Sequence, residues 1–239
     1  MLIRQGEHRG TSADRKLAWS LAGIAGALNG AGFYAAGLYS SHMTGTVSTM
    51  ADHLALGHLA AFGVALAVVG TFVAGAVVST LLINAGNRRG LSAIYAYSVI
   101  LEALLLAGLG AADLWLHDEL RGPTLVMGLS FLMGLQNAVV TRISNARVRT
   151  THVTGMITDI GIELGNLLDV AGHRTDPERV RSTIDKLKTH VPTVASFFAG
   201  GVLGVLGYSA GGPMLFVALA VVLAGFAAPV IVTQWRTAA

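Results

Sequence analysis

The sequence predicts an all-α membrane protein with six transmembrane helices, arranged as two three-helix repeats of opposite orientation. Two compositional observations and one repeated motif support this prediction. Of the 239 residues, 53% are hydrophobic and 12% are charged, whereas a soluble domain carries about 25% charged residues. The apolar residues form blocks long enough to cross a hydrocarbon core of about 30 Å, which takes about 20 helical residues. Because lipid offers no hydrogen bonds and the blocks are too continuous for barrel strands, we expect helices.

The apolar blocks divide the chain into a tail and two halves. The predicted spans cover residues 17–39, 60–83, 91–116, 123–140, 191–208 and 213–235. The predicted units are a basic cytoplasmic tail over 1–16, a first repeat over 17–116 and a second repeat over 117–239. In the second half, Asp176-Pro177 is typical of a helix start, and apolar residues then recur at helical spacing. We therefore expect an amphipathic helix near 177–190, at the membrane interface or running directly into the fifth span.

The distribution of Lys and Arg predicts the orientation. If the N-terminus is inside, all 16 Lys and Arg residues except Arg121 fall in segments on the inner side. Because Lys and Arg bias a loop to the cytoplasm, we expect both termini to be cytoplasmic.

Several functional classes are disfavoured by the residues present. The chain has no cysteine, which excludes disulfides and thiolate chemistry. The net charge is +3, but the basic residues lie between apolar blocks, so we expect no nucleic-acid binding. His53 and His58 are five residues apart and diverge on a helix, and no nucleophile–base pair stands out. We therefore expect no enzyme, no catalytic residues, no cofactor and no metal site.

A motif recurs after the first and the fourth span. Residues 26–29 (Gly-Ala-Leu-Asn) are followed by 42–45 (His-Met-Thr-Gly), and residues 134–137 (Gly-Leu-Gln-Asn) by 152–155 (His-Val-Thr-Gly). With three spans in each copy, the second copy must cross the membrane upside down, which places the first motif near the outer face and the second near the inner face. Inverted repeats are frequent in secondary transporters, but some form channels.

The repeated residues are candidates for binding or gating. Each Thr-Gly pair is typical of a place where one helix stops and another begins, and the N-terminus of the new helix would suit an anion or a carboxylate. The alternatives are ordinary caps and turns for these motifs, and helix–helix hydrogen bonds for the amides. The candidate substrate-binding or gating residues are Asn29, His42, Thr44, Gly45, Glu102, Gln136, Asn137, Arg142, His152, Thr154, Gly155 and Asp159.

Glu102 and Arg142 enter this set for other reasons. Glu102 lies near the middle of the third span, where an ionised carboxylate costs about 2.5–3.5 kcal/mol. We expect it to be protonated or paired with a cation, either as a proton-coupling group or as a hydrogen-bonding group that never titrates. Arg142, with Arg147 and Arg149, follows the fourth span. These arginines either bind an anion or lipid headgroups, or only fix the orientation.

The second motif also carries a family resemblance. The stretch from Gly134 through Arg149-Thr-Thr-His-Val-Thr-Gly155 to Gly161 closely resembles the YoaK-type membrane proteins, a family of unknown function, and the resemblance extends over about residues 17–235. The first motif of that family carries Asp-Ala and ends in Met-Thr-Gly-Asn, whereas this chain has Asn29-Gly30 and Thr46 there. If that aspartate couples ions in relatives, Asn29 puts such coupling in doubt. The resemblance implies a six-span protein of the bacterial cytoplasmic membrane, without a substrate.

These observations favour a small-solute secondary transporter with a site at the membrane midplane between the two halves. A channel or lipid-interacting pore is the first alternative, and a structural membrane protein without transport activity is the second. The expected partners are the lipid bilayer and an unidentified small solute, with an anion among the candidates. Homo-oligomerisation stays open.

Overall fold

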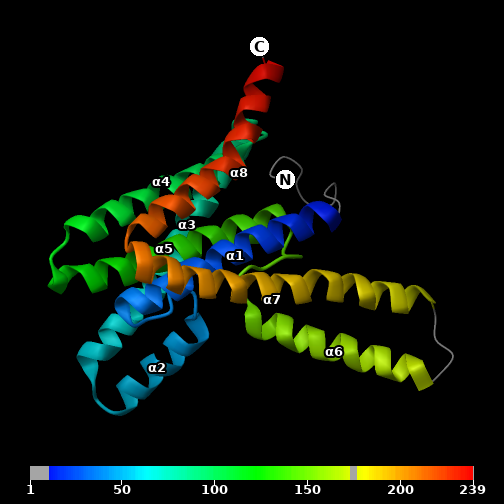
Figure 1. The fold of residues 1–239 in the computed structure, drawn as a ribbon, viewed down its shortest axis with the longest axis horizontal. Helices are drawn as coiled ribbons and strands as arrows, with labels where there is room; N and C mark the ends of the chain where they lie inside the picture. Colours follow the sequence, from blue (N-terminus) through cyan, green and yellow to red (C-terminus); the bar gives the residue numbers. More distant parts are fainter. Residues whose placement is uncertain (1–10, 173–176, 239) are drawn as a thin grey trace.

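The computed structural model describes residues 11–172 and 177–238. In these ranges the chain forms eight α-helices and no strand (Figure 1). The helices are α1 (Thr11–Ala36), α2 (Met43–Ala55), α3 (Leu59–Arg88), α4 (Ile94–Trp115), α5 (Asp118–Ile143), α6 (Val153–Gly172), α7 (Pro177–Gly211) and α8 (Met214–Ala238). Most of the predicted tail, with Arg4 and Arg9, and the residues Arg174 and Asp176 lie outside the described ranges.

Five of the described helices, α3, α4, α5, α7 and α8, are long and apolar enough to cross a membrane. These helices indicate a multi-pass membrane protein, as the composition predicts. Helix α1 is not among them, although it has 26 residues. Its side chains Leu17, Leu21 and Leu28 are at most 1% exposed. Because α1 is enclosed largely by other helices, it can hold Asn29 and several glycines where a lipid-facing helix would need large apolar residues.

Some helix boundaries differ from the predicted spans for local reasons. Helix α1 ends at Ala36 because Gly37 adopts a positive φ of 74°, a conformation that glycine tolerates and that ends helices. The predicted amphipathic helix and fifth span are one continuous helix, α7, which selects the second of the two expected arrangements. Helix α5 begins at Asp118, so Pro123 lies inside the helix, in its second turn, where it removes one backbone hydrogen bond without ending the helix.

The long helices pack in pairs of defined direction. Helices α1 and α7 run parallel, and so do α3 and α5, whereas α1 and α5, and α4 and α8, run antiparallel. For α1 and α7, Arg15 contacts Asp185 and Tyr34 contacts Tyr208, so residue numbers rise together along the two helices. For α3 and α5, Thr71 contacts Met127 and Asn84 contacts Arg142 in the same sense. For α1 and α5, Asp14 contacts Arg147, just after α5, and Gly32 contacts Leu129, so the numbers run in opposite senses. For α4 and α8, Ala93 contacts Gln234 and Gly110 contacts Phe216, again in opposite senses.

The two parallel pairs cross at glycines in the same way. In α1, a Cβ atom at Gly26 would collide with the carbonyl oxygen of Phe197 in α7. In α5, a Cβ atom at Gly134 would collide with the carbonyl oxygen of Phe72 in α3. The reciprocal collisions are Gly200 with the carbonyl of Gly23, and Gly75 with the carbonyl of Phe131. Small residues thus let the backbones touch at both crossings.

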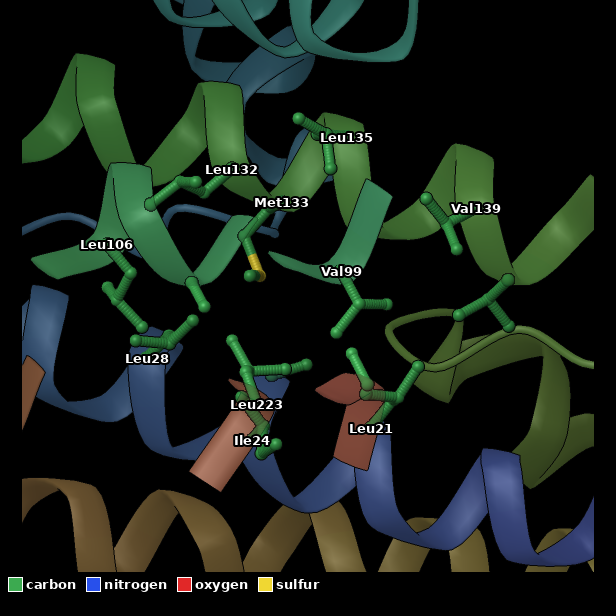
Figure 2. Packing of buried hydrophobic residues seen from close by; sticks show 14 of the residues in the cluster. Leu21, Ile24, Leu28, Val99, Leu106, Leu132, Met133, Leu135, Val139 and Leu223 are labelled. Carbon is green, nitrogen blue, oxygen red and sulfur yellow. The ribbon is translucent and has the colours of Figure 1, made fainter. Parts of the chain in front are cut away.

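A buried apolar core lies where α1, α4, α5 and α8 meet (Figure 2). Its labelled members in Figure 2 are Leu21, Ile24, Leu28, Val99, Leu106, Leu132, Met133, Leu135, Val139 and Leu223. The short helices α2 and α6 lie outside this core: α2 packs on α3, and α6 lies along α7 (Figure 1). The repeated motifs lie at the starts of α2 and α6.

Candidate functional site

Two asparagines fold the chain back toward the middle of the helices. Asn29 Oδ1 in α1 accepts hydrogen bonds from the backbone N–H of Ser41 at 3.1 Å and from its hydroxyl at 3.0 Å. Asn137 Oδ1 in α5 accepts a hydrogen bond from the hydroxyl of Thr151 at 2.8 Å. Each asparagine therefore holds the segment just before a short helix against a long one. The amides were expected to join helices or line a cavity; Asn29 and Asn137 line the cavity described below and also hold the loop that follows their helix.

Each short helix begins at a His-x-Thr-Gly motif. Helix α2 begins at Met43, directly after His42, and α6 begins at Val153, directly after His152. A Cβ atom at Gly45 or at Gly155 would collide with the ring of the motif's own histidine. Glycine thus makes room for the imidazole in both copies. The helix break lies before each Thr-Gly pair rather than at it, because the pair forms part of the first helical turn.

The two motifs meet at one cavity of about 730 Å³. This finding corrects the expectation that they lie near opposite faces of the membrane: because each asparagine pulls its loop back, both helix starts reach the same space. The cavity volume is within the usual range for small-molecule sites, about 300–1,000 Å³. The lining side chains include Asn29, Tyr39, Ser41, His42 and Thr44 from the first copy, Asn137, Arg149, Thr151, His152 and Thr154 from the second, and Phe72 and Phe197 between them.

The cavity is electropositive. Among its described lining residues, Arg149 is the charged side chain, and no aspartate or glutamate joins it. Arg149 makes no hydrogen bond or ion pair with the described part of the chain. The first turns of α2 and α6 also line the cavity, and the N–H groups of a first helical turn lack intrahelical partners and carry partial positive charge. The site therefore favours an anionic group.

Smaller cavities adjoin this one. A cavity of about 480 Å³ between α2 and α3 shares Tyr39 and His42 with it. A cavity of about 300 Å³ beside α6 and α7 shares Arg149 and His152 with it and reaches His190. The central cavity is thus adjoined on two sides, by one cavity toward α2 and α3 and by another toward α6 and α7.

The structure gathers most of the predicted site residues. Seven of them line the central cavity, namely Asn29, His42, Thr44, Asn137, His152, Thr154 and Gly155. Two line the adjoining cavities, Gly45 beside α3 and Asp159 beside α7. Three lie elsewhere: Arg142 hydrogen-bonds Asn84 of α3, and Glu102 and Gln136 pair with each other. Among the described residues, no three His, Asp or Glu side chains converge as a metal site requires.

Glu102 has an amide partner. Its Oε1 accepts a hydrogen bond of 2.9 Å from Gln136 Nε2, between α4 and α5. Both side chains are fully buried. Of the two arrangements expected from the sequence, a cation partner is not found among the described residues.

Sequence reasoning missed several lining residues. Phe72 and Phe197 each begin a Phe-x-x-Gly stretch that ends at a crossing glycine. Ser41 and Thr151 directly precede the two histidines and belong to the compared stretches, but they were not counted as candidates. The Phe-x-x-Gly recurrence was visible in the chain and could have extended the motif. Arg149 was named with Arg142 and Arg147 as an arginine that binds an anion or only fixes the orientation, but it was not placed among the candidate site residues.

Two polar clusters lie away from the cavity. Asp113 in α4 accepts hydrogen bonds from Arg121 Nε at 2.5 Å and from the Tyr208 hydroxyl at 2.6 Å, which joins α4, α5 and α7. At the other side, Lys186 in α7 donates to Glu163 in α6 at 2.7 Å. That hydrogen bond is the main reason why the pKa of Glu163 falls to about 2. Both clusters tie helices together.

Comparison with known proteins gives a family and no activity. The sequence profile of the family described as "Protein of unknown function (DUF1275)" matches residues 17–228. No curated protein and no solved structure matches the chain. The match covers most of the chain, including both His-x-Thr-Gly motifs, and is consistent with the YoaK-type resemblance. This chain therefore belongs to the DUF1275 family of proteins of unknown function.

Proposed function

We propose that this protein is a secondary transporter of a small anionic solute, and that the solute binds in the central cavity between the two His-x-Thr-Gly motifs. The observation that carries the proposal is that both copies of the motif line one cavity. Transporters built from inverted repeats place their substrate site near the midplane, where helix starts point at the anionic groups of the substrate.

The packing supports an inverted repeat. If α1, α3 and α4 correspond to α5, α7 and α8, an inverted second copy makes α1 and α5 antiparallel and makes both crossing pairs parallel, as the contacts have them. The glycine crossings correspond as well: Gly26 against Phe197 in one pair matches Gly134 against Phe72 in the other. Two unrelated halves have no physical reason to share these contacts residue by residue.

The proposal includes six spans with both termini in the cytoplasm. Helix α1 supplies the sixth span. It is less apolar than the other five, but it lies between α5 and α7 and lipid touches little of it. The Lys and Arg distribution supports the orientation, because Arg121 alone falls on the predicted outer side. In a bacterium this arrangement belongs in the cytoplasmic membrane.

The cavity lining supports an anion as the solute. Arg149 offers a guanidinium with no carboxylate beside it in the cavity, and a guanidinium binds a carboxylate or phosphate through two parallel hydrogen bonds. Asn29, Asn137, His42 and His152 add neutral polar groups around it. An anionic solute in the central cavity would therefore neutralise the charge of Arg149, with which no described carboxylate of that cavity pairs.

The proposal is tested first by binding. Purified protein is screened by thermal shift against mono- and dicarboxylates and organic phosphates, each beside its neutral amide or alcohol. A bound ligand raises the melting temperature by mass action, so the acids are expected to stabilise the wild type and not Arg149→Ala. Equal shifts for acids and neutral analogues, or no shift with any, would contradict the anionic class.

Transport is then measured with the stabilising anion. In proteoliposomes we expect uptake that saturates with concentration and depends on a proton or sodium gradient. A channel is the second candidate, because cavities adjoin the central one in two directions. Flux that rises linearly with concentration and follows only the solute's own gradient would favour the channel and reject the transporter.

A further inference from the structure

The pair of Glu102 and Gln136 has an incomplete set of hydrogen bonds. Gln136 Nε2 donates to Glu102 Oε1 at 2.9 Å. The other oxygen of the acid, Glu102 Oε2, and the amide oxygen, Gln136 Oε1, have no hydrogen-bond partner in the described part of the chain. Both residues are 0% exposed. Two buried acceptors without a donor on a single pair of side chains require an explanation.

In the described part of the chain, no charge compensates a carboxylate at this place. Helix α4 packs against α3, α5 and α8, and none of these directs a charged side chain at Glu102, whose one polar partner among the described residues is Gln136. The charged residues of the four helices lie toward the helix ends. They are Arg88 of α3, Asp113 of α4, Asp118, Glu119, Arg121 and Arg142 of α5, and Arg236 of α8. The titratable tyrosines Tyr95 and Tyr97 lie near the start of α4.

A single proton satisfies both unpaired oxygens. If Glu102 Oε2 carries a hydrogen, it can donate to Gln136 Oε1, while Gln136 Nε2 continues to donate to Glu102 Oε1. The acid and the amide then form a closed pair with two hydrogen bonds and no net charge. We propose that Glu102 and Gln136 form a proton-binding site between α4 and α5, and that Glu102 is the neutral acid in the structure described.

The first half of the chain shows that packing does not require this pair. The stretch Gly134-Leu135-Gln136-Asn137 aligns with Gly26-Ala27-Leu28-Asn29, so Leu28 stands where the second copy has Gln136. Leu28 is fully buried in the apolar core (Figure 2). An apolar side chain therefore fills the equivalent position without a polar partner, and the acid–amide pair supplies chemistry that the fold itself does not need.

Release of the proton from Glu102 requires a change at the α4–α5 interface. Loss of the proton to water would leave a carboxylate facing the oxygen of Gln136, with no cation from residues 11–172 or 177–238 beside it. The α4–α5 interface must therefore admit water or separate before the proton exchanges. The proton site does not depend on the transporter proposal. Combined with that proposal, it assigns the proton as the coupling ion.

Infrared spectroscopy of the full-length protein in lipid nanodiscs tests the inference. A protonated carboxylic acid has a carbonyl stretch that a carboxylate lacks, and it shifts when deuterium replaces the exchangeable hydrogen. At neutral pH we expect this band in the wild type and its loss in Glu102→Gln. In Gln136→Leu the band should persist but move, because the hydrogen bonds to the amide are gone. The Glu102→Gln protein should fold, since its amide can make both hydrogen bonds.

A spectrum of Glu102→Gln identical to that of the wild type would overturn the proposal. The pH dependence of stability gives a second, independent readout. The melting temperature of the wild type should fall relative to Glu102→Gln as the pH rises above about 4.3, where an exposed glutamic acid ionises, because the unfolded chain then loses a proton that the folded protein keeps. Parallel pH profiles for the two proteins would also overturn the proposal. Neither readout uses a solute, so its failure leaves the transporter proposal to be judged separately.

Discussion

Replacing Gly200 with alanine adds one methyl group at the crossing of α1 and α7. A Cβ atom at this position would collide with the carbonyl oxygen of Gly23, and the nearest atoms are all backbone. Backbone cannot rotate away as a side chain can, so the two helices must separate or bend. The neighbouring Gly201 provides a matched control, because a Cβ atom there would lie 3.7 Å from the nearest atom, the carbonyl oxygen of Gly26, an ordinary contact.

The magnitude follows from two opposing effects. Overpacking a tight interface typically costs about 1–3 kcal/mol, whereas alanine is favoured over glycine in a helix interior by about 1 kcal/mol. Gly201→Ala gains the second term without the first. The free energy of unfolding should therefore be about 1–3 kcal/mol lower for Gly200→Ala than for Gly201→Ala, with the upper half of the range expected because the collision is with backbone.

Thermal unfolding of the purified variants in detergent measures this difference. For a chain of this size, about 1 kcal/mol corresponds to about 2–4 °C, so a difference in the upper half of the expected free-energy range should separate the melting temperatures of the two variants by about 4–12 °C. Gly134→Ala at the other crossing should behave like Gly200→Ala, since its Cβ atom meets the carbonyl of Phe72. Equal melting temperatures for Gly200→Ala and Gly201→Ala would refute the reasoning from backbone contact.

Other changes test the cavity and the helix ties. Arg149→Ala should weaken anion binding about tenfold or more, because a charged hydrogen bond contributes about 1.5–3 kcal/mol, whereas Arg142→Ala, outside the cavity, should leave affinity unchanged. The lowered pKa of Glu163 stabilises the fold above its unfolded value of about 4.3. This contribution is lost as the pH falls toward 2, so the melting-temperature gap between wild type and Lys186→Gln should shrink there. Tyr208→Phe removes a donor to a buried carboxylate and should cost about 1–3 kcal/mol in chemical denaturation; no change would contradict its bridging role.

The helices were predictable because their physical signal is local. Apolar blocks of sufficient length determine α3, α4, α5, α7 and α8, and the composition of each block is enough to identify it. Helix α1 is less apolar than these five, but the apolar block over residues 17–39 was still sufficient to predict a helix there. The continuity of α7 through Pro192 could not be decided, because proline can end or merely bend a helix and neighbouring helices settle which occurs.

The cavity was predictable only in its parts. The sequence identified both His-x-Thr-Gly motifs but placed them near opposite faces, since it gave no sign that the loops turn back. That turn depends on the hydrogen bonds of Asn29 and Asn137 to residues twelve and fourteen positions later. The partner of Glu102 was equally hidden, because it depends on the register between α4 and α5. Tertiary contacts, and not local preferences, decide each of these features.

The central claim is that two motifs from opposite halves of the chain meet at one cavity. The chain has no native cysteine, so a double variant with cysteines at Thr44 and Thr154 can be treated with a short bifunctional thiol reagent. Both positions line the cavity of about 730 Å³, and we predict an intramolecular cross-link, with none for the control pair at Val47, which does not line the cavity, and Thr154. If the motifs lie at opposite faces, about 30 Å of hydrocarbon separates them. Failure of Thr44 and Thr154 to cross-link, while each single cysteine reacts with the reagent, would contradict the claim.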